Sequence, residues 1–191
     1  MYLGCMYLGC TYLGRMDKWP LVGHNVVVAR GSLLQVALGA AAGAFVWTAT
    51  EYSVHRWVLH GPFGTGKLKK VPIGSMHRAH HRDPEETSLV MRTAGHLSLA
   101  AVAGLASVPL SSALPAVAAR AMAATWSLGY SSYEINHWNY HHRPARTALG
   151  QRLRDRHHQH HFGAPRSNLG VTMTFWDHLL GTEAPGSPAD G

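Results

Sequence analysis

The chain has 191 residues, enough for one domain of ordinary size. Apolar residues make up 46% of it and charged residues only 14%, which excludes an intrinsically disordered chain, because disorder requires high charge and low hydrophobicity. The net charge of +7 favours anionic partners. The two cysteines are too few for a secreted domain that is stabilised by disulfides. The chain also has 15 histidines, more than the chemistry of a protein surface explains.

The first fifteen residues repeat a five-residue unit, MYLGC MYLGC TYLGR, which is too short to be a solenoid repeat. They lack the basic start and apolar run of a signal peptide. We expect residues 1–15 to be a disordered extension and residues 16–183 to form the functional domain. The Pro- and Gly-rich residues 184–191 are expected to be a disordered tail.

Three long apolar runs predict helices that cross a membrane. Residues 31–50 carry no charge and are long enough to span a bilayer core. The second run, 94–114, is interrupted by Pro109, and the third, 113–133, has Arg120 as its only charged residue. The alternative is a soluble all-α domain with buried helices. The length of the runs, their richness in small residues and their lack of polar faces favour the membrane.

Basic residues lie between the first and second runs and after the third, while the turn Pro109–Pro115 carries no charge. The positive-inside rule therefore places both basic segments in the cytosol and the turn on the other side. Two alternatives remain for the side of the membrane on which the N-terminal residues lie. Arg15, Lys18 and Arg30 lie outside if residues 19–50 cross once, and the alternative is that residues 19–50 form a re-entrant or doubled-back pair.

Most histidines fall in clusters beside the cytosolic ends of these runs. On a helix, with about 100° per residue, each of three groups shares one face. These groups are His77, His80 and His81; His137 and His141; and His157, His160 and His161. His55 and His60 diverge by about 140° on a regular helix, so they either reach different metals or need a distorted helix end.

Imidazoles on one face repel each other when protonated, whereas neutral imidazole is the commonest metal ligand in proteins. Ten histidines could therefore give two metals about five ligands each: His55, His60, His77, His80, His81, His137, His141, His157, His160 and His161. No cysteine lies in the clusters, which excludes a Cys-rich structural zinc site. Imidazole donors suit zinc, copper, iron and nickel.

The motifs HRWVLH, HRAHH, HWNYH, HHQHH and NLGVTMTFWDHLLGT follow one another between about Glu51 and Thr182. Together they resemble the fatty acid hydroxylase/sterol desaturase superfamily, and most closely its fatty acid 2-hydroxylase branch. The resemblance implies an all-α integral membrane helical bundle with a cytosolic His-rich helical cap over a dinuclear metal site. It implies two iron ions, with zinc as an alternative occupant in purified protein, held by the same ten histidines.

The resemblance further implies a membrane-bound di-iron oxygenase that hydroxylates or desaturates a long-chain lipid, above all a fatty acyl chain. O2 is the co-substrate, and the electrons come from an external donor of ferredoxin or cytochrome b5 type with its reductase. The catalytic face is expected to be cytosolic, in the cell membrane of a bacterium or the endoplasmic reticulum of a eukaryote.

Two alternatives remain open. A β-carotene hydroxylase of the bacterial type has similar histidine boxes, although residues 168–182 fit that group less well. A metal-binding or metal-transport membrane protein is the alternative from outside the enzymes. A transporter needs polar residues in mid-span, where this sequence has only Arg120.

Four further residues are candidates to orient the metal ligands, because a ligating histidine usually donates its other ring N–H to a nearby acceptor. Glu51 precedes His55 by four residues and Glu134 precedes His137 by three. Asp177, in the closing motif, is expected to orient a ligand of the last cluster. His158 lies about 100° from its neighbour His157 and is expected to point outward or to support a ligand.

Arginines between the histidine motifs form a basic face that contacts lipid phosphates or docks an acidic electron carrier. This face comprises Arg78, Arg82, Arg152, Arg154 and Arg156. Nucleic acid is not an expected partner, because the sequence has no recognition motif for it.

Overall fold

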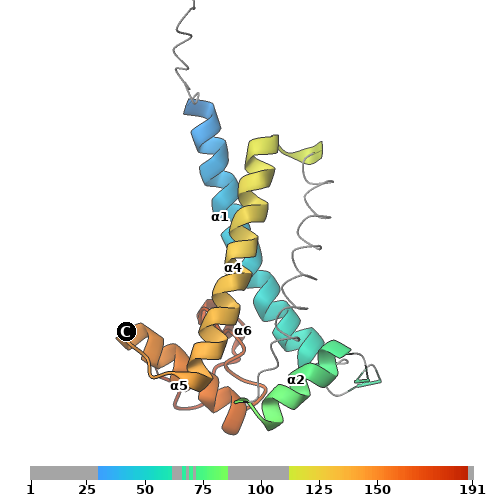
Figure 1. Ribbon diagram of the computed structural model, residues 1–191, viewed down its shortest axis with the longest axis vertical. Helices are drawn as coiled ribbons and strands as arrows, with labels where there is room; N and C mark the ends of the chain where they lie inside the picture. Colours follow the sequence, from blue (N-terminus) through green and yellow to red (C-terminus); the bar gives the residue numbers. More distant parts are fainter. Residues whose placement is uncertain (1–29, 62–65, 68, 71, 86–111, 189–191) are drawn as a thin grey trace, which may run out of the picture.

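A computed structural model of the chain describes residues 30–61, 66–67, 69–70, 72–85 and 112–188. Every regular element within these ranges is helical: α1 (Arg30–Ser53), the π-helical turn η1 (Val54–Leu59), α2 (Pro72–Arg82), α4 (Ala116–His142), α5 (Ala148–Phe162) and α6 (Phe175–Leu180). The long helices α1 and α4 lie side by side, and α2, α5 and α6 gather at one end of them as a cap (Figure 1). The predicted all-α fold is confirmed for the described residues.

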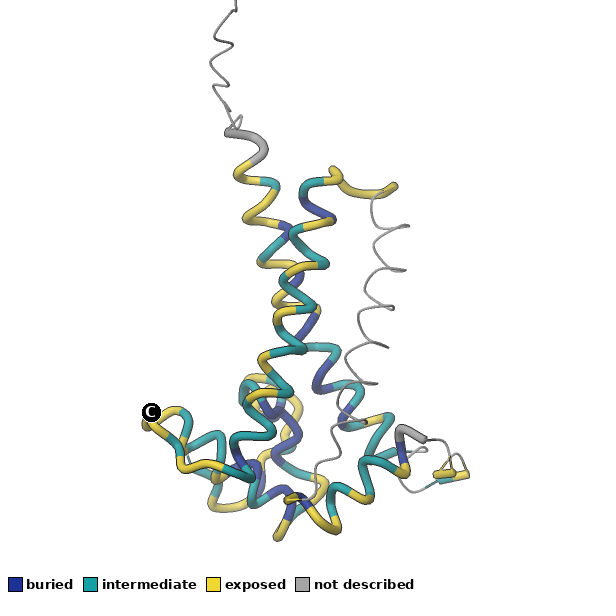
Figure 2. Tube along the Cα trace, viewed as in Figure 1, coloured by how far each residue is buried: buried dark blue, intermediate teal, exposed yellow. Residues whose placement is uncertain are grey.

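Helix α1 and the turn that follows it present an apolar surface to the surroundings. Within the described part of the chain, this is the one helix that is long and apolar enough to cross a membrane, over Leu33–Leu59. The side chains of Leu34 and Leu38 are 61% and 60% exposed. Buried residues instead concentrate in the cap, as Figure 2 shows. One of the three predicted spans is therefore found as a candidate membrane helix.

The other predicted segments have different outcomes. The second apolar run falls within residues 86–111, apart from its last three positions, and the N-terminal repeat 1–15 also lies outside the described residues. The third run is part of α4, which continues unbroken to His142 and carries the third histidine cluster on its last turns. The second half of α4 is rich in Ser, Tyr and His, so α4 is less apolar than α1.

Two glycines allow α1 and α4 to approach closely. Gly39 and Gly43 lie one turn apart and face the backbone carbonyls of Ala118 and Met122 on α4. A Cβ atom at either glycine would overlap the facing carbonyl. Small residues at this spacing are typical of close helix pairs in membranes. Nearer the cap, the buried side chain of Trp47 fills the space between the two helices.

The chain after α5 folds back over the cap. Asn168, with a φ of 52°, donates from its amide to Gln159 of α5 at 2.9 Å. The amide oxygen of Asn168 accepts from the backbone N–H of Ala184 at 3.1 Å and from the Ser187 hydroxyl at 3.0 Å. Further along, Gln159 of α5 donates to the carbonyl of Pro185 at 3.0 Å and accepts from the Ser187 hydroxyl at 2.8 Å, and Ala184 is buried.

Candidate metal centre

Ten histidines converge in the cap in two groups of five. Within each group the five ligand nitrogens, one from each ring, all lie within 4.8 Å of one another. Cluster A contains His55, His60, His77, His81 and His160, and cluster B contains His80, His137, His141, His157 and His161. The clusters are adjacent, because the rings of His81 and His161 stack with their centroids 4.2 Å apart. These are the ten histidines that the sequence singles out.

The helices of the cap contribute to the clusters in an interleaved way. Of the three clustered histidines of α2, the first and last join cluster A and the middle one joins cluster B. In α5 the assignment is reversed, with two histidines in cluster B and His160 in cluster A. The turn η1 and its C-cap residue His60 supply the remaining pair of cluster A, and α4 supplies the remaining pair of cluster B. Both α2 and α5 therefore belong to both clusters.

The π-helical turn at the end of α1 brings His55 and His60 together. The backbone N–H of His60 donates to the carbonyl of His55 at 3.0 Å, which is the i to i+5 hydrogen bond of a π-helix. This wider turn places residues five apart on one face, and the two ring centroids lie 4.9 Å from each other. Of the two alternatives for this pair, the structure adopts the distorted helix end.

The spacing of the ring nitrogens suits ligands that share a metal. Two nitrogens that are each about 2.1 Å from a metal lie about 3 Å apart when the angle at the metal is close to 90°. Three pairs of facing Nε2 atoms have separations of 2.9, 3.2 and 2.9 Å: His60 with His77, His81 with His160, and His141 with His157.

Two further nitrogens point to the same conclusion. The Nε2 atoms of His55 and His80 are buried without a hydrogen-bond partner among the described residues. A buried polar atom without a partner is costly, and a metal ion would remove that cost. The two clusters are therefore consistent with a dinuclear metal site.

Clustered imidazoles of the cap are held in the neutral form that metals bind. Burial lowers the pKa of His80 and His81 to about 4, and the neighbouring His81 and His55 rings add to the respective effects. Burial also holds the pKa of His157 and of His160 well below the usual range of histidine. At neutral pH these rings are uncharged, so each offers a lone pair to a cation.

Two histidines of cluster A are oriented by backbone carbonyls. The Nδ1 atom of His55 donates to the carbonyl of Leu169 at 2.6 Å, and Nδ1 of His160 donates to that of Ser167 at 2.9 Å. A carbonyl can only accept, so both rings carry their proton on Nδ1 and leave Nε2 for a metal. The sequence offers no signal for these contacts, since any residue type has a carbonyl.

The four residues expected to orient ligands make different contacts. Glu51 and Asp177 accept hydrogen bonds from the backbone of residues 169–172, not from a described imidazole. The Nε2 atom of His158 donates to the carbonyl of Tyr140 at 2.8 Å, and its ring stacks on that of His141. Glu134 is half-buried and forms no hydrogen bond with another described residue.

The expected basic docking face is smaller than the sequence indicates. Arg156 is only 1% exposed, and it pairs with Glu183 at 3.0 Å and with Asp177 at 3.8 Å. A buried arginine in an ion-pair network is not available to a partner protein. Exposed arginines of the cap include Arg82, Arg143 and Arg146.

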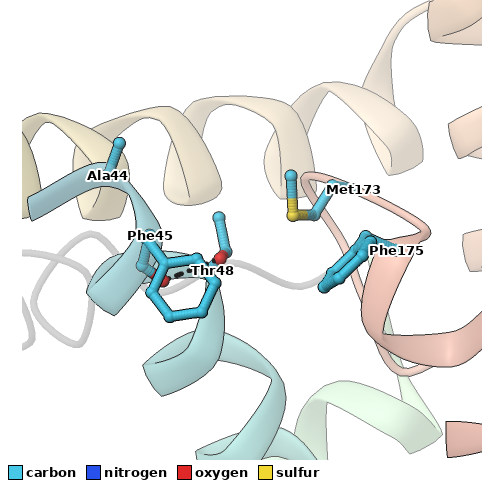
Figure 3. Close-up of a pocket in the computed structure, with 5 residues that line it drawn as sticks. All are labelled: Ala44, Phe45, Thr48, Met173 and Phe175. Atoms are coloured by element: carbon cyan, nitrogen blue, oxygen red, sulfur yellow. Dashed lines mark hydrogen bonds between the residues drawn. The ribbon is translucent and has the colours of Figure 1, made fainter. Parts of the chain in front are cut away.

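An apolar pocket of about 310 Å³ lies between α1 and the C-terminal segment. Ala44, Phe45 and Thr48 line it from α1, and Met173 and Phe175 line it from the other side (Figure 3). The pocket-lining part of α1 also belongs to the candidate membrane helix. A pocket of this composition suits a hydrocarbon chain.

Residues 40–182 match the family model "Fatty acid hydroxylase", and this match covers most of the chain. The chain belongs to the fatty acid hydroxylase family. The resemblance of its histidine motifs is thereby confirmed. Its similarity extends to individual relatives and to a solved structure.

Fatty acid 2-hydroxylase of Homo sapiens is 27% identical over 76% of this chain and 39% of its own length. The ceramide very long chain fatty acid hydroxylase scs7 of Schizosaccharomyces pombe is 30% identical over 75% of this chain and 41% of its own length. The solved structure "Full length scs7p (only hydroxylase domain visible)" has a TM-score of 0.61 at 23% identity, over 86% of this chain and 62% of that one. The chain thus spans about two fifths of the length of these two curated relatives.

Proposed function

We propose that this chain is a membrane-embedded di-iron hydroxylase of a lipid acyl chain, which uses O2 and electrons from an external donor. The observation that carries the proposal is the pair of five-histidine clusters in a member of the fatty acid hydroxylase family. The relatives named as 2-hydroxylases support hydroxylation next to the carboxyl carbon of the chain.

In this proposal the five histidines of cluster A hold one iron ion and those of cluster B hold the other. The bound pair supplies the activation of O2 and the oxidation of a C–H bond. The protein's own part is to present neutral imidazoles and to fix their rings, as the carbonyls of Ser167 and Leu169 do for His160 and His55. Iron rather than another metal is inferred from the family.

The apolar pocket beside α1 is the proposed binding site for the acyl chain. Phe45, Met173 and Phe175 provide apolar walls, which exclude water from the hydrocarbon. Because the pocket is next to the outward-facing apolar surface of α1, a lipid can reach it directly from the bilayer. The cap with the metal clusters lies in the cytosol in this arrangement, as the distribution of basic residues indicates.

The two electrons that each hydroxylation consumes are proposed to come from an acidic carrier of ferredoxin or cytochrome b5 type. Exposed Arg82, Arg143 and Arg146 on the cap favour a partner of opposite charge. Attraction of this kind speeds encounter and weakens with rising salt.

An isotope experiment tests the proposal. The purified chain is reconstituted with iron, an acidic carrier, its reductase and a fatty acyl lipid, under ¹⁸O₂ in ordinary water. We expect one labelled oxygen in the acyl chain next to the carboxyl end, and no product when the carrier is omitted. Label from water or anaerobic turnover would contradict an oxygenase. Hydroxylation of β-carotene in place of the acyl lipid would contradict the substrate class.

A further inference from the structure

Residues 167–172, which we call the strap, connect the C-terminal segment to cluster A. The strap carbonyls of Ser167 and Leu169 are the acceptors for the Nδ1 atoms of His160 and His55. These two ligands come from different elements, α5 and η1. The position of the strap therefore sets the orientation of two cluster A rings at once.

Two buried carboxylates hold the strap by four consecutive backbone N–H groups. Asp177 accepts from Leu169 N–H at 2.8 Å and from Gly170 N–H at 2.9 Å, one with each carboxylate oxygen. Glu51 accepts from Val171 N–H at 2.6 Å and Thr172 N–H at 2.9 Å, both with Oε1. The two carboxylate side chains are fully or almost fully buried. Hydrogen bonds to a buried carboxylate are about twice as strong as neutral ones.

The strap has no counterpart at cluster B in the described part of the chain. The Nδ1 atom of His157 is buried without a hydrogen-bond partner there. The other ring nitrogen of His157 faces His141 at 2.9 Å within the cluster. The two clusters therefore differ in the hydrogen bonds made by the ring nitrogens that face away from the cluster.

We propose that Glu51 and Asp177 are positioning residues for the metal of cluster A and not for that of cluster B. They act through the strap, because neither carboxylate touches an imidazole in the described contacts. This inference rests on the proposed metal centre. Loss of a partner that orients a ligand typically weakens metal binding about 10- to 100-fold.

The two carboxylates differ in a way that makes the inference testable. Both oxygens of Asp177 accept from a backbone N–H, so Asp177→Asn places an NH₂ group against one of these donors. Glu51 uses Oε1 for both backbone donors, and Oε2 faces the hydroxyl of Thr172. The amide of Glu51→Gln retains the acceptor and can donate to that hydroxyl. Glu51→Leu removes all three contacts.

The experiment measures iron per chain in the whole 191-residue chain, equilibrated with a graded series of a chelator. We expect Asp177→Asn and Glu51→Leu to lose one iron at a free-iron concentration about 10- to 100-fold higher than the wild type does, and to keep the second iron as the wild type does. Glu51→Gln should titrate like the wild type. Asp155→Asn, which changes an exposed carboxylate on α5, is the matched control.

Histidine variants assign the weakened site. With His157→Ala as background, which disables cluster B, Asp177→Asn should weaken the remaining iron. With His55→Ala as background, which disables cluster A, it should have no effect. Equal weakening of both metals, weakening at cluster B or no weakening would overturn the inference. A wild-type chain that binds no metal would instead refute the proposed function.

A measurement on the wild type avoids variants that fail to fold. Because coupling between metal binding and strap order is reciprocal, removal of iron should loosen the strap. We expect faster hydrogen–deuterium exchange at the amides of residues 169–172 after chelation. Unchanged exchange at these amides would also overturn the inference.

Discussion

A neutral imidazole has one ring nitrogen that donates and one that accepts, so a ligand histidine needs a partner on each side. His55 and His160 meet this need with a backbone carbonyl on one side and the inside of cluster A on the other. His158 also has a backbone carbonyl on one side, that of Tyr140 at its Nε2 atom, but its ring belongs to neither cluster. Neighbouring histidines of one helix therefore differ in whether a ring nitrogen is available to a metal.

His80 provides the sharpest contrast with its neighbours, because it is the α2 residue that belongs to cluster B. We predict that His80→Ala removes iron and lowers activity by at least about 10-fold, since loss of a metal ligand costs at least as much as loss of its outer partner. Iron analysis and turnover are measured on the same preparation. His158→Ala is the control and should keep both metals. Full iron content in His80→Ala would contradict its role as a ligand.

The sequence predicts the ten clustered residues but not all of their outer partners. Histidine spacing reports on shared helix faces, so the ten could be selected before their contacts were known. The acceptors of His55 and His160 are main-chain atoms, which leave no trace in residue type. Glu51 contacts residues about 120 positions further along the chain, a distance at which helical periodicity carries no information.

At the scale of the elements, helix α1 both packs against α4 and positions two of the clustered histidines. Its first half packs on α4 through Gly39 and Gly43, and its end turns into the π-helical segment that carries His55 and His60. The length of the apolar run could be predicted, because it depends on composition alone. The π-helical turn could not be, since a five-residue spacing also fits two ligands on different metals.

We predict that Gly39→Leu destabilises the protein by about 1–3 kcal/mol, because the added side chain overlaps the Ala118 carbonyl and forces α1 away from α4. Thermal unfolding in detergent, followed by circular dichroism, measures the change. Leu38→Ala alters the adjacent residue, whose side chain is 60% exposed, and should unfold close to the wild-type temperature. Equal melting of the two variants would show that the close approach at Gly39 contributes nothing.

The stability of helix α5 depends on a side-chain hydrogen bond at its N-terminus. The N-cap residue Thr147, which precedes Ala148, accepts from the backbone N–H of Gly150 at 3.0 Å through its hydroxyl. Because such a cap contributes about 1 kcal/mol, Thr147→Ala should lower the free energy of unfolding by that amount. Chemical denaturation measures it, with Thr147→Ser as the conservative control. A loss in Thr147→Ser equal to that in Thr147→Ala would argue against the cap.

For the whole molecule, the proposed orientation puts the cap in the cytosol and the start of α4 on the other side. Ser112, just before α4, is exposed, and so is Gln151 on α5. In a chain whose Cys5 and Cys10 are replaced by Ser, we predict that Ser112→Cys reacts with an impermeant thiol reagent added to intact cells. Gln151→Cys should react only after lysis. The reverse pattern would invert the orientation.

If the clusters hold metal as proposed, their interleaved histidines should make the cap sensitive to metal removal. Among the elements described, α2 packs against η1, and the ring of its His80 contacts the imidazoles of His137 on α4 and His161 on α5. We predict that chelation exposes α2 to trypsin, which cleaves after Arg78 and Arg82. Cleavage rates with and without chelator are compared on gels, with restored resistance after iron is added back. Equal rates would show that α2 is held without metal.

The sharing of α2 and α5 between both clusters has a consequence for how the protein is made. Each ion would join segments that leave the ribosome at different times, since α5 follows α2 by more than sixty residues. Neither coordination sphere can be completed until the last histidines of α5 have been synthesised. With the metal centre proposed above, metal uptake is therefore a late event in the making of this chain, and a lack of metal would leave newly made chains with an open cap.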